Sequence, residues 1–292
     1  MTLRELYGYG RKELEEKGMN EADLNAWYLL QSCLEKEPFS YSRSRFFMEQ
    51  NQEAPQEVKK EYEEKISARK KHIPLEYITG YTEFMGLPFW VNESVLIPRQ
   101  DTELLVELAL QEAKGKRVLD LCTGSGCIGL SIAALGNPFC VTLSDISREA
   151  IEVARRNQRY LEKMGQWKER KPTIEFAIGD LWDAIHDSYD LILSNPPYIE
   201  TSELSRLMPE VIEHEPVSAL DGGESGLDFY EKIVDGAKEY LRQEGILMVE
   251  IGYNQGEAVK QLMEDNGFVN VQIKKDLNGL HRVVRGNLKK KG

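Results

Sequence analysis

The sequence predicts an α/β protein with a doubly wound, mostly parallel seven-stranded sheet, preceded by a small helical domain and a β-hairpin connector. From residue 117 onward, short β-rich apolar runs alternate with helical segments, which is typical of βαβ units. Before residue 73 the apolar residues recur at spacings of three and four, as in amphipathic helices. The expected domains are therefore 1–72, 73–98 and 99–292.

The composition is that of an ordinary globular protein. The chain has 292 residues, of which 41% are hydrophobic and 29% charged, and its formal net charge is −12. An acidic balance works against sequence-independent capture of duplex DNA, which depends on lysine and arginine. A local basic patch is still possible at the short basic runs "RKKHIP" (69–74) and "KKKG" (289–292), but such runs are more typical of solvated surface.

The chain shows neither a signal peptide nor a membrane span. Its first residues are charged from position 4, and no later stretch approaches the roughly 20 apolar residues that cross a bilayer. We therefore expect a cytoplasmic protein. The four cysteines have no CxxC spacing and no histidine cluster beside them, so we expect reduced thiols and no metal site.

The helical pattern of the first domain is carried by apolar residues at spacings of three and four, namely Leu24, Trp27, Tyr28, Cys33, Val58, Tyr62 and Ile66. Between residues 74 and 98 the sequence becomes β-rich and aromatic and is punctuated by glycines and prolines, which suggests a hairpin whose aromatics could also meet a partner. The next helix could be capped by Asp101 or Thr102 and end at Gly115.

The remaining elements alternate in order. Strands are expected at 117–121, 140–144, 173–178, 189–194, 245–251, 269–274 and 281–285. Helices are expected from about 128 and 149, and near 228–242 and 257–266. The last two strands are joined by "DLNG", which suits an antiparallel pair.

A glycine-rich loop follows the first strand of the sheet. "LDLCTGSGCIGL" places Gly124, Gly126 and Gly129 between this strand and its helix, as in a nucleotide-binding loop, and this motif alone leaves a dinucleotide-dependent dehydrogenase possible. Asp145 ends the second strand, where a carboxylate can bind ribose hydroxyls or can share a helix cap with Ser147. Asp180 follows the third strand, as an adenine contact or as a turn residue.

The fourth strand ends in "SNPPYI". Two prolines fix φ and carry no N–H, so the carbonyls of Asn195 and Pro196, with the Asn195 side-chain oxygen, can accept from a planar NH2 group and aim its nitrogen at an electrophile. Tyr198 can pack on such a substrate and near a cation such as a methyl sulfonium. The alternative is that the prolines only terminate the strand.

At this point the chain resembles the HemK-like protein-(glutamine-N(5)) methyltransferases, which belong to the class I S-adenosylmethionine-dependent methyltransferases. The resemblance covers nearly the whole chain and includes "IPRQDTE", "LDLCTGSGCIGL", "SNPPYI", "EPVSALDGGESGLDFY" and "HRVVRG". The NPPY tetrapeptide alone is a weak signal, because adenine-DNA and some ribosomal methyltransferases have similar ones.

This resemblance implies S-adenosylmethionine as cofactor and the glutamine of the Gly-Gly-Gln loop of class I peptide-chain release factors as substrate. Asn195, Pro196 and Tyr198 would be catalytic, and the N-terminal domain and connector would hold the protein substrate. The implied cofactor contacts are Cys122, Thr123, Gly124, Ser125, Gly126, Asp145, Asp180, Leu181 and Asn195. The implied substrate-amide site is Asn195, Pro196, Pro197 and Tyr198. Cys122 stands where glycine is common, and Leu181 where some relatives have an aromatic residue.

Three alternatives remain open. A nucleic-acid methyltransferase acting on an exocyclic amine would use the same corner, although the acidic balance speaks against it, and no stable nucleic-acid binding is expected. A non-catalytic adenosine-binding module and a dehydrogenase are the others. The scattered histidines (His72, His186, His214 and His281) indicate no catalytic base, and Glu213 and Glu215 are expected to lie in a solvated turn.

Overall fold

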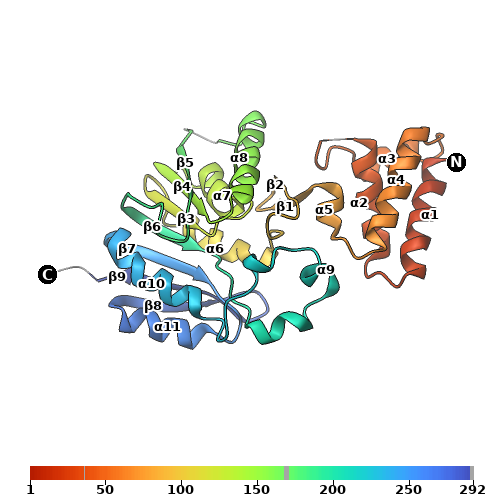
Figure 1. The fold of residues 1–292 in the computed structure, drawn as a ribbon. Helices are drawn as coiled ribbons and strands as arrows, with labels where there is room; N and C mark the ends of the chain where they lie inside the picture. The colour runs from red at the N-terminus through yellow and green to blue at the C-terminus, as the bar shows by residue number, and fades with distance from the viewer. Residues whose placement is uncertain (36, 168–170, 290–292) are drawn as a thin grey trace. The chain divides into compact units, whose positions relative to one another are not determined.

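The computed structural model describes residues 1–35, 37–167 and 171–289, and the last three residues of the predicted basic "KKKG" run lie outside this range. The chain forms two compact units, Met1–Tyr81 with Met208–His214, and Thr82–Leu207 with Glu215–Gly292. No helix among the described residues is long and apolar enough to cross a membrane. Figure 1 shows the elements of both units.

The first unit is helical, as predicted. Its helices are α1 (Leu3–Glu16), α2 (Ala22–Leu34), α3 (Arg43–Glu49), α4 (Gln56–Arg69), α5 (Leu75–Thr79) and α9 (Pro209–Ile212). Thr2 begins α1 with a capping box, in which its hydroxyl accepts the Glu5 N–H while the Glu5 side chain accepts the Thr2 N–H. Trp27, Cys33, Tyr62 and Ile66 lie in its core, as their spacing predicts, whereas Leu24 of the same pattern is exposed.

Two expectations for this unit are wrong. Arg69, which opens the predicted basic run, is buried, and its guanidinium binds Asn25 at 2.6 Å and Glu210 at 2.9 Å. A charge this deep needs such partners, so Arg69 is a structural group rather than part of a basic surface. The segment predicted to be β-rich begins with α5, because Pro74 precedes it and Gly80, at φ +85°, ends it.

The hairpin follows as predicted and consists of β1 (Tyr81–Phe84) and β2 (Leu87–Trp90). Its aromatics are not generally available to a partner, because Phe84 and Phe89 are buried in the core of the second unit. The buried Asn157 connects this hairpin to the glycine-rich loop. Its amide donates to the carbonyls of Trp90 at 3.0 Å and Ser125 at 2.8 Å, and its oxygen accepts the Trp90 N–H at 2.7 Å.

The second unit has the predicted seven-stranded sheet, in the order β5-β4-β3-β6-β7-β9-β8. Its strands are β3 (Arg117–Leu121), β4 (Cys140–Asp145), β5 (Thr173–Ile178), β6 (Tyr189–Ser194), β7 (Leu241–Glu250), β8 (Phe268–Lys275) and β9 (His281–Leu288). The pairs among β3 to β7 are parallel, whereas β9 is antiparallel to both of its neighbours. The seven strands and the final antiparallel pair are therefore confirmed.

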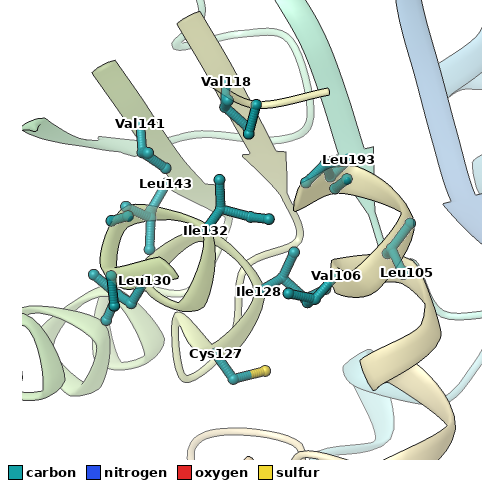
Figure 2. Close-up of a cluster of buried hydrophobic side chains, with 14 of the residues drawn as sticks. Leu105, Val106, Val118, Cys127, Ile128, Leu130, Ile132, Val141, Leu143 and Leu193 are labelled. Atoms are coloured by element: carbon teal, nitrogen blue, oxygen red, sulfur yellow. The ribbon is translucent and has the colours of Figure 1, made fainter. Parts of the chain in front are cut away.

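Helices cover both faces of this sheet. The larger elements are α6 (Gln100–Leu110), α7 (Cys127–Leu135), α8 (Arg148–Lys163), α10 (Asp228–Tyr240) and α11 (Gly256–Asp265), and the short 3-10 helices are η1 (Thr201–Arg206) and η2 (Val217–Ala219). Alternate residues of each strand point to opposite faces, so Leu191 and Leu193 of β6 join α6, α7 and α8 while Ile192 joins α10 and α11. Figure 2 shows Val118, Val141 and Leu143 of the strands facing α7.

The predicted cap of α6 is wrong. The helix is preceded by Arg99, and Asp101 and Thr102 lie in its first turn rather than before it. Asp101 still stabilises the beginning of the helix, because the positive end of the helix dipole attracts a carboxylate in the first turn. The helix ends at Leu110, so Gly115 belongs to the turn before β3 rather than to the cap, and its φ of +71° explains the glycine there.

Candidate functional site

A pocket of about 260 Å³ lies where four parallel strands of the second unit end. The segments that follow β3, β4, β5 and β6 all contribute to its wall, as expected for ligand sites in open α/β sheets. Nine of the predicted site residues line it, namely Cys122, Thr123, Gly124, Ser125, Asp145, Asp180, Leu181, Asn195 and Pro197. These nine residues therefore lie together at one pocket, whereas Gly126, Pro196 and Tyr198 lie outside its lining.

The glycine-rich loop is anchored by Asp120, which the sequence reasoning did not single out. This fully buried carboxylate accepts the Thr123 hydroxyl at 2.5 Å and the Gly129 N–H at 2.9 Å. Burial raises the pKa of Asp120 to about 7. The loop is therefore held by a carboxyl group whose pKa is close to neutral pH.

The loop residues have distinct reasons for their identity. Gly124 has φ +54°, and a Cβ on it would meet no atom within 4 Å, so its backbone faces open space. Gly126 has φ +82° and precedes α7, and a Cβ there would lie 3.0 Å from the Cβ of Ala154. This close packing against α8 accounts for Gly126 without contact to a ligand. Cys122 has φ +58°, the left-handed region that glycine adopts freely.

Asp145 closes the loop from the end of β4. Its carboxylate accepts the N–H groups of Gly124 at 2.8 Å and Ser147 at 2.9 Å, and burial raises its pKa. The residue that caps α8 is Ser147, whose hydroxyl accepts the Ala150 N–H at 3.0 Å. Each carboxylate oxygen has two acceptor sites, so Asp145 keeps capacity for two further donors at the pocket.

The segment after β5 forms the next part of the wall. The Asp180 side chain is exposed, and its carbonyl accepts the Asp183 N–H at 3.0 Å, so Asp180 both lines the pocket and belongs to a turn. Leu181 is buried and has φ +45°, an uncommon conformation for a residue with a γ-branched side chain. This backbone turns the Leu181 side chain into the junction between the pocket and the core.

The Asn-Pro-Pro-Tyr corner follows β6. The Asn195 side chain donates from Nδ2 to the Thr102 hydroxyl at 3.2 Å, and Pro196 and Pro197 are buried. The Tyr198 hydroxyl donates to Glu250 at 3.3 Å, and burial keeps the pKa of Tyr198 well above its usual value. Only Asn195 and Pro197 of these four line the pocket.

The glycines of "DGGESG" fit against the backbone of this corner. A Cβ on Gly222 would lie 2.7 Å from the Tyr198 Cα, and a Cβ on Gly226 would lie 2.6 Å from the Tyr198 carbonyl oxygen. That carbonyl accepts Nε2 of the buried Gln255 at 2.9 Å. Glycine is needed at both positions because the two chain segments approach too closely for any side chain.

Glu215 contradicts the prediction of a solvated turn. It is buried, accepts the Ile97 N–H at 3.2 Å and forms an ion pair with Arg99. Arg99 lines the pocket, so Glu215 holds one wall of the site. The only sequence signal for this role is the joint presence of "IPRQDTE" and "EPVSAL", since no local pattern shows that Glu215 points inward.

Comparison with known proteins agrees with this architecture. Residues 5–80 match the family model "PrmC N-terminal domain", and residues 99–225 match "Methyltransferase small domain". A crystal structure of a methyltransferase from Pyrococcus furiosus has a TM-score of 0.53 at 18% identity and covers 70% of this chain and 91% of its own, which supports the fold.

Curated relatives define the family more narrowly. The release factor glutamine methyltransferase of Geobacter sulfurreducens is 39% identical over 289 residues, which are 98% of this chain and 97% of that protein. The protein of the same name from Clostridium acetobutylicum is 40% identical over 257 residues, which are 84% and 88% of the two chains. The similarity to the Geobacter protein extends over nearly the whole of both chains. The chain therefore belongs to the release factor glutamine methyltransferase family.

Proposed function

We propose that the protein transfers the methyl group of S-adenosylmethionine to the side-chain amide nitrogen of the glutamine in the Gly-Gly-Gln loop of class I peptide-chain release factors. Family membership supports this reaction. The observation that carries it is the Asn195 amide at the pocket wall, whose Nδ2 is bound to Thr102 so that its oxygen is left for a substrate donor. A planar primary amide is such a donor.

The residues of the pocket fit S-adenosylmethionine. Asp145 has two acceptor sites left for ribose hydroxyls, and the open backbone at Gly124 lets a ligand approach. Ser144 lines the pocket, and its buried hydroxyl has no hydrogen-bond partner among the described residues, as expected where a polar ligand completes the site. Leu181 offers an apolar surface beside them, where we place the adenine, with Asp180 at its edge.

The chain contributes orientation rather than a covalent intermediate. When bound, S-adenosylmethionine supplies the electrophile, which is a methyl group on a positively charged sulfur. The sulfur keeps the electron pair of the carbon–sulfur bond as the methyl group leaves. The Asn195 side-chain oxygen, with the carbonyls of Asn195 and Pro196, accepts the N–H groups of the glutamine and aims its nitrogen lone pair along the line of transfer. We place Tyr198 and Pro197 against the flat amide. The amide nitrogen loses its proton after transfer, and we assign no side-chain base.

We further propose that the N-terminal helical region presents the release factor, with the sequence-derived bounds 1–72 for this domain, 73–98 for the connector and 99–292 for the methyltransferase domain. A glutamine in a protein loop must be delivered from outside the pocket, and the family model for residues 5–80 is distinct from that for the catalytic part. Because release factors act on ribosomes, we place the enzyme in the cytoplasm.

Methyl transfer can be tested with labelled S-adenosylmethionine and a purified release factor. Label should enter the intact factor and be absent from its Gln→Ala loop variant, from duplex DNA and from ribosomal RNA. Asn195→Ala should lower kcat at least about 100-fold, because an oriented acceptor at the reacting centre is lost. Lys260→Ala, on α11 and away from the pocket, is the matched control and should keep full activity. Label on nucleic acid instead of the factor would refute the proposed substrate.

A further inference from the structure

Arg99 is the cation of an ion pair in the pocket wall. Its guanidinium donates from Nη2 to Oε1 of Glu215. The Arg99 side chain is 39% exposed and lines the pocket, whereas the Glu215 side chain is 1% exposed and lies outside the lining. Glu215 therefore holds the guanidinium from the protein side, and its second oxygen, Oε2, is occupied by the Ile97 N–H at 3.2 Å.

The guanidinium keeps most of its hydrogen-bonding capacity. It has five N–H donors in a planar fork. Among the residues that the structure describes, Glu215 is the only side chain that binds it. A half-exposed arginine that is paired on one side can still bind a second anion on its open side, which for Arg99 is the side of the pocket.

The charge of the ligand indicates which group this anion is. The charged side chains that line the pocket are two acidic and two basic ones, namely Asp145, Asp180, Arg99 and Lys232. S-adenosylmethionine carries a single anionic group, the α-carboxylate of its methionine part, beside the cationic sulfonium and α-ammonium. Its adenosine part and the side-chain amide of a glutamine are neutral. A cation of the wall can therefore meet an opposite charge only at the α-carboxylate.

Lys232 lies at the adenine side of the pocket. Its carbonyl accepts Nε1–H of Trp182 at 3.0 Å, and Trp182 directly follows Leu181, beside which we place the adenine. The Lys232 ammonium lies 5.7 Å from the centroid of the Phe229 ring. These contacts place Lys232 beside the segment that follows β5.

Arg99 lies at the other side. It directly precedes α6, and Thr102 in the first turn of this helix accepts Nδ2–H of Asn195, which follows β6, at 3.2 Å. In the order β5-β4-β3-β6, the ends of β5 and β6 are the two outer ones of the four. With the ribose on Asp145 of β4 and the adenine beside β5, the methionine part of the cofactor extends toward β3 and β6 and therefore toward Arg99.

We propose that Arg99 binds the α-carboxylate of S-adenosylmethionine. This inference rests on the cofactor of the proposed function. The guanidinium can give two parallel N–H groups to the two carboxylate oxygens while Nη2 remains bound to Glu215. Because the carboxylate and the sulfur belong to the same short chain, this contact also limits where the sulfonium methyl group lies relative to the Asn195 corner.

Decarboxylated S-adenosylmethionine isolates this contact, because it lacks the α-carboxylate and keeps the sulfonium, the amine and the adenosine. Isothermal titration calorimetry gives the Kd of both compounds for the full chain. In Arg99→Gln, we expect the Kd of S-adenosylmethionine to rise about 10- to 100-fold, as when a hydrogen-bonded charge pair is lost. The Kd of the decarboxylated compound should rise less than about threefold. Lys232→Gln removes the other cation of the pocket and is the matched control, in which both Kd values should change by the same factor.

Two results would overturn the proposal. One is an equal rise of both Kd values in Arg99→Gln, and the other is a loss confined to S-adenosylmethionine in Lys232→Gln instead. Arg99→Gln leaves the buried Glu215 without its cation, which can prevent folding. In that case Arg99→Gln/Glu215→Gln, which leaves no unpaired charge, is compared with Glu215→Gln, and the same selective loss is expected. The binding assay needs no release factor, so this selectivity in a protein that leaves the release factor unlabelled would support the inference and refute the proposed substrate.

Discussion

The substitution Asp120→Asn tests whether the buried carboxyl group that holds the glycine-rich loop has a pKa near 7. Asp120 is completely buried on β3, and burial raises its pKa to about 7, although Thr123 and Gly129 donate to it. An aspartate in the unfolded chain ionises near pH 3.9. Between these two pH values the folded protein holds a proton that the unfolded chain has released.

The sign and size of the effect follow from this difference. Where the folded state binds the extra proton, the free energy of unfolding falls as the pH rises, by at most about 1.4 kcal/mol per pH unit for one group. For a folded pKa of about 7, the fall between pH 6 and pH 8 amounts to about 1.4 kcal/mol and then levels off. Asp120→Asn removes this contribution, because an amide does not titrate. The stability difference, wild type minus variant, should therefore decrease by about 1.4 kcal/mol from pH 6 to pH 8.

Urea denaturation followed by circular dichroism at half-unit pH steps measures this difference. Other titrating groups, including Glu250, affect both proteins equally and cancel in the subtraction. Asp235→Asn, at an exposed position on α10, is the matched control, because it removes a carboxylate that is not buried. A pH-independent difference between wild type and Asp120→Asn would refute the assignment of a raised pKa to this residue.

Three further substitutions test local reasons for residue identity by the same denaturation assay. Gly126→Ala should destabilise the protein by about 2–3 kcal/mol, since it combines a φ of +82° with a Cβ only 3.0 Å from that of Ala154; an effect below 0.5 kcal/mol would contradict this packing. Cys122→Gly should stabilise it by up to about 1 kcal/mol by relieving a left-handed backbone, and a loss of stability would speak against that strain. Asn157→Ala should lower the free energy of unfolding by about 2–4 kcal/mol, because the backbone of Trp90 loses its buried partners, and an unchanged midpoint would refute this role.

The sheet was predictable because its strands are continuous apolar runs separated by helices, and burial on both faces leaves few other arrangements. The position of the pocket was predictable from the parallel sheet, since the carboxyl ends of parallel strands meet at one edge. Asp145 and Asn195 could be assigned to this edge from their place after a strand alone. Neither step required knowledge of a side-chain contact.

What could not be predicted depends on long-range contacts between loops. Glu215 resembles a surface residue in its local sequence, and only the fold brings it to Ile97 and Arg99, more than 100 residues earlier in the chain. Thr102 likewise fits a helix cap by its type, but α6 begins at Gln100, two residues before it. Local propensity cannot distinguish these cases, because a buried polar side chain is identified by its partners rather than by its neighbours in sequence.

These contacts explain why three motifs together indicate the family better than the Asn-Pro-Pro-Tyr corner does. The motif "IPRQDTE" supplies Thr102, which holds the Asn195 side chain. The motif "EPVSALDGGESGL" supplies Gly222 and Gly226, which leave room for the Tyr198 backbone. The corner can orient an NH2 group in several kinds of methyltransferase. The two surrounding motifs fix the position of the corner relative to the pocket and to the protein surface from which a substrate arrives. We therefore expect the choice of a protein amide over a nucleobase amine to depend on these supporting segments, and to be lost when they are exchanged while the four corner residues are kept.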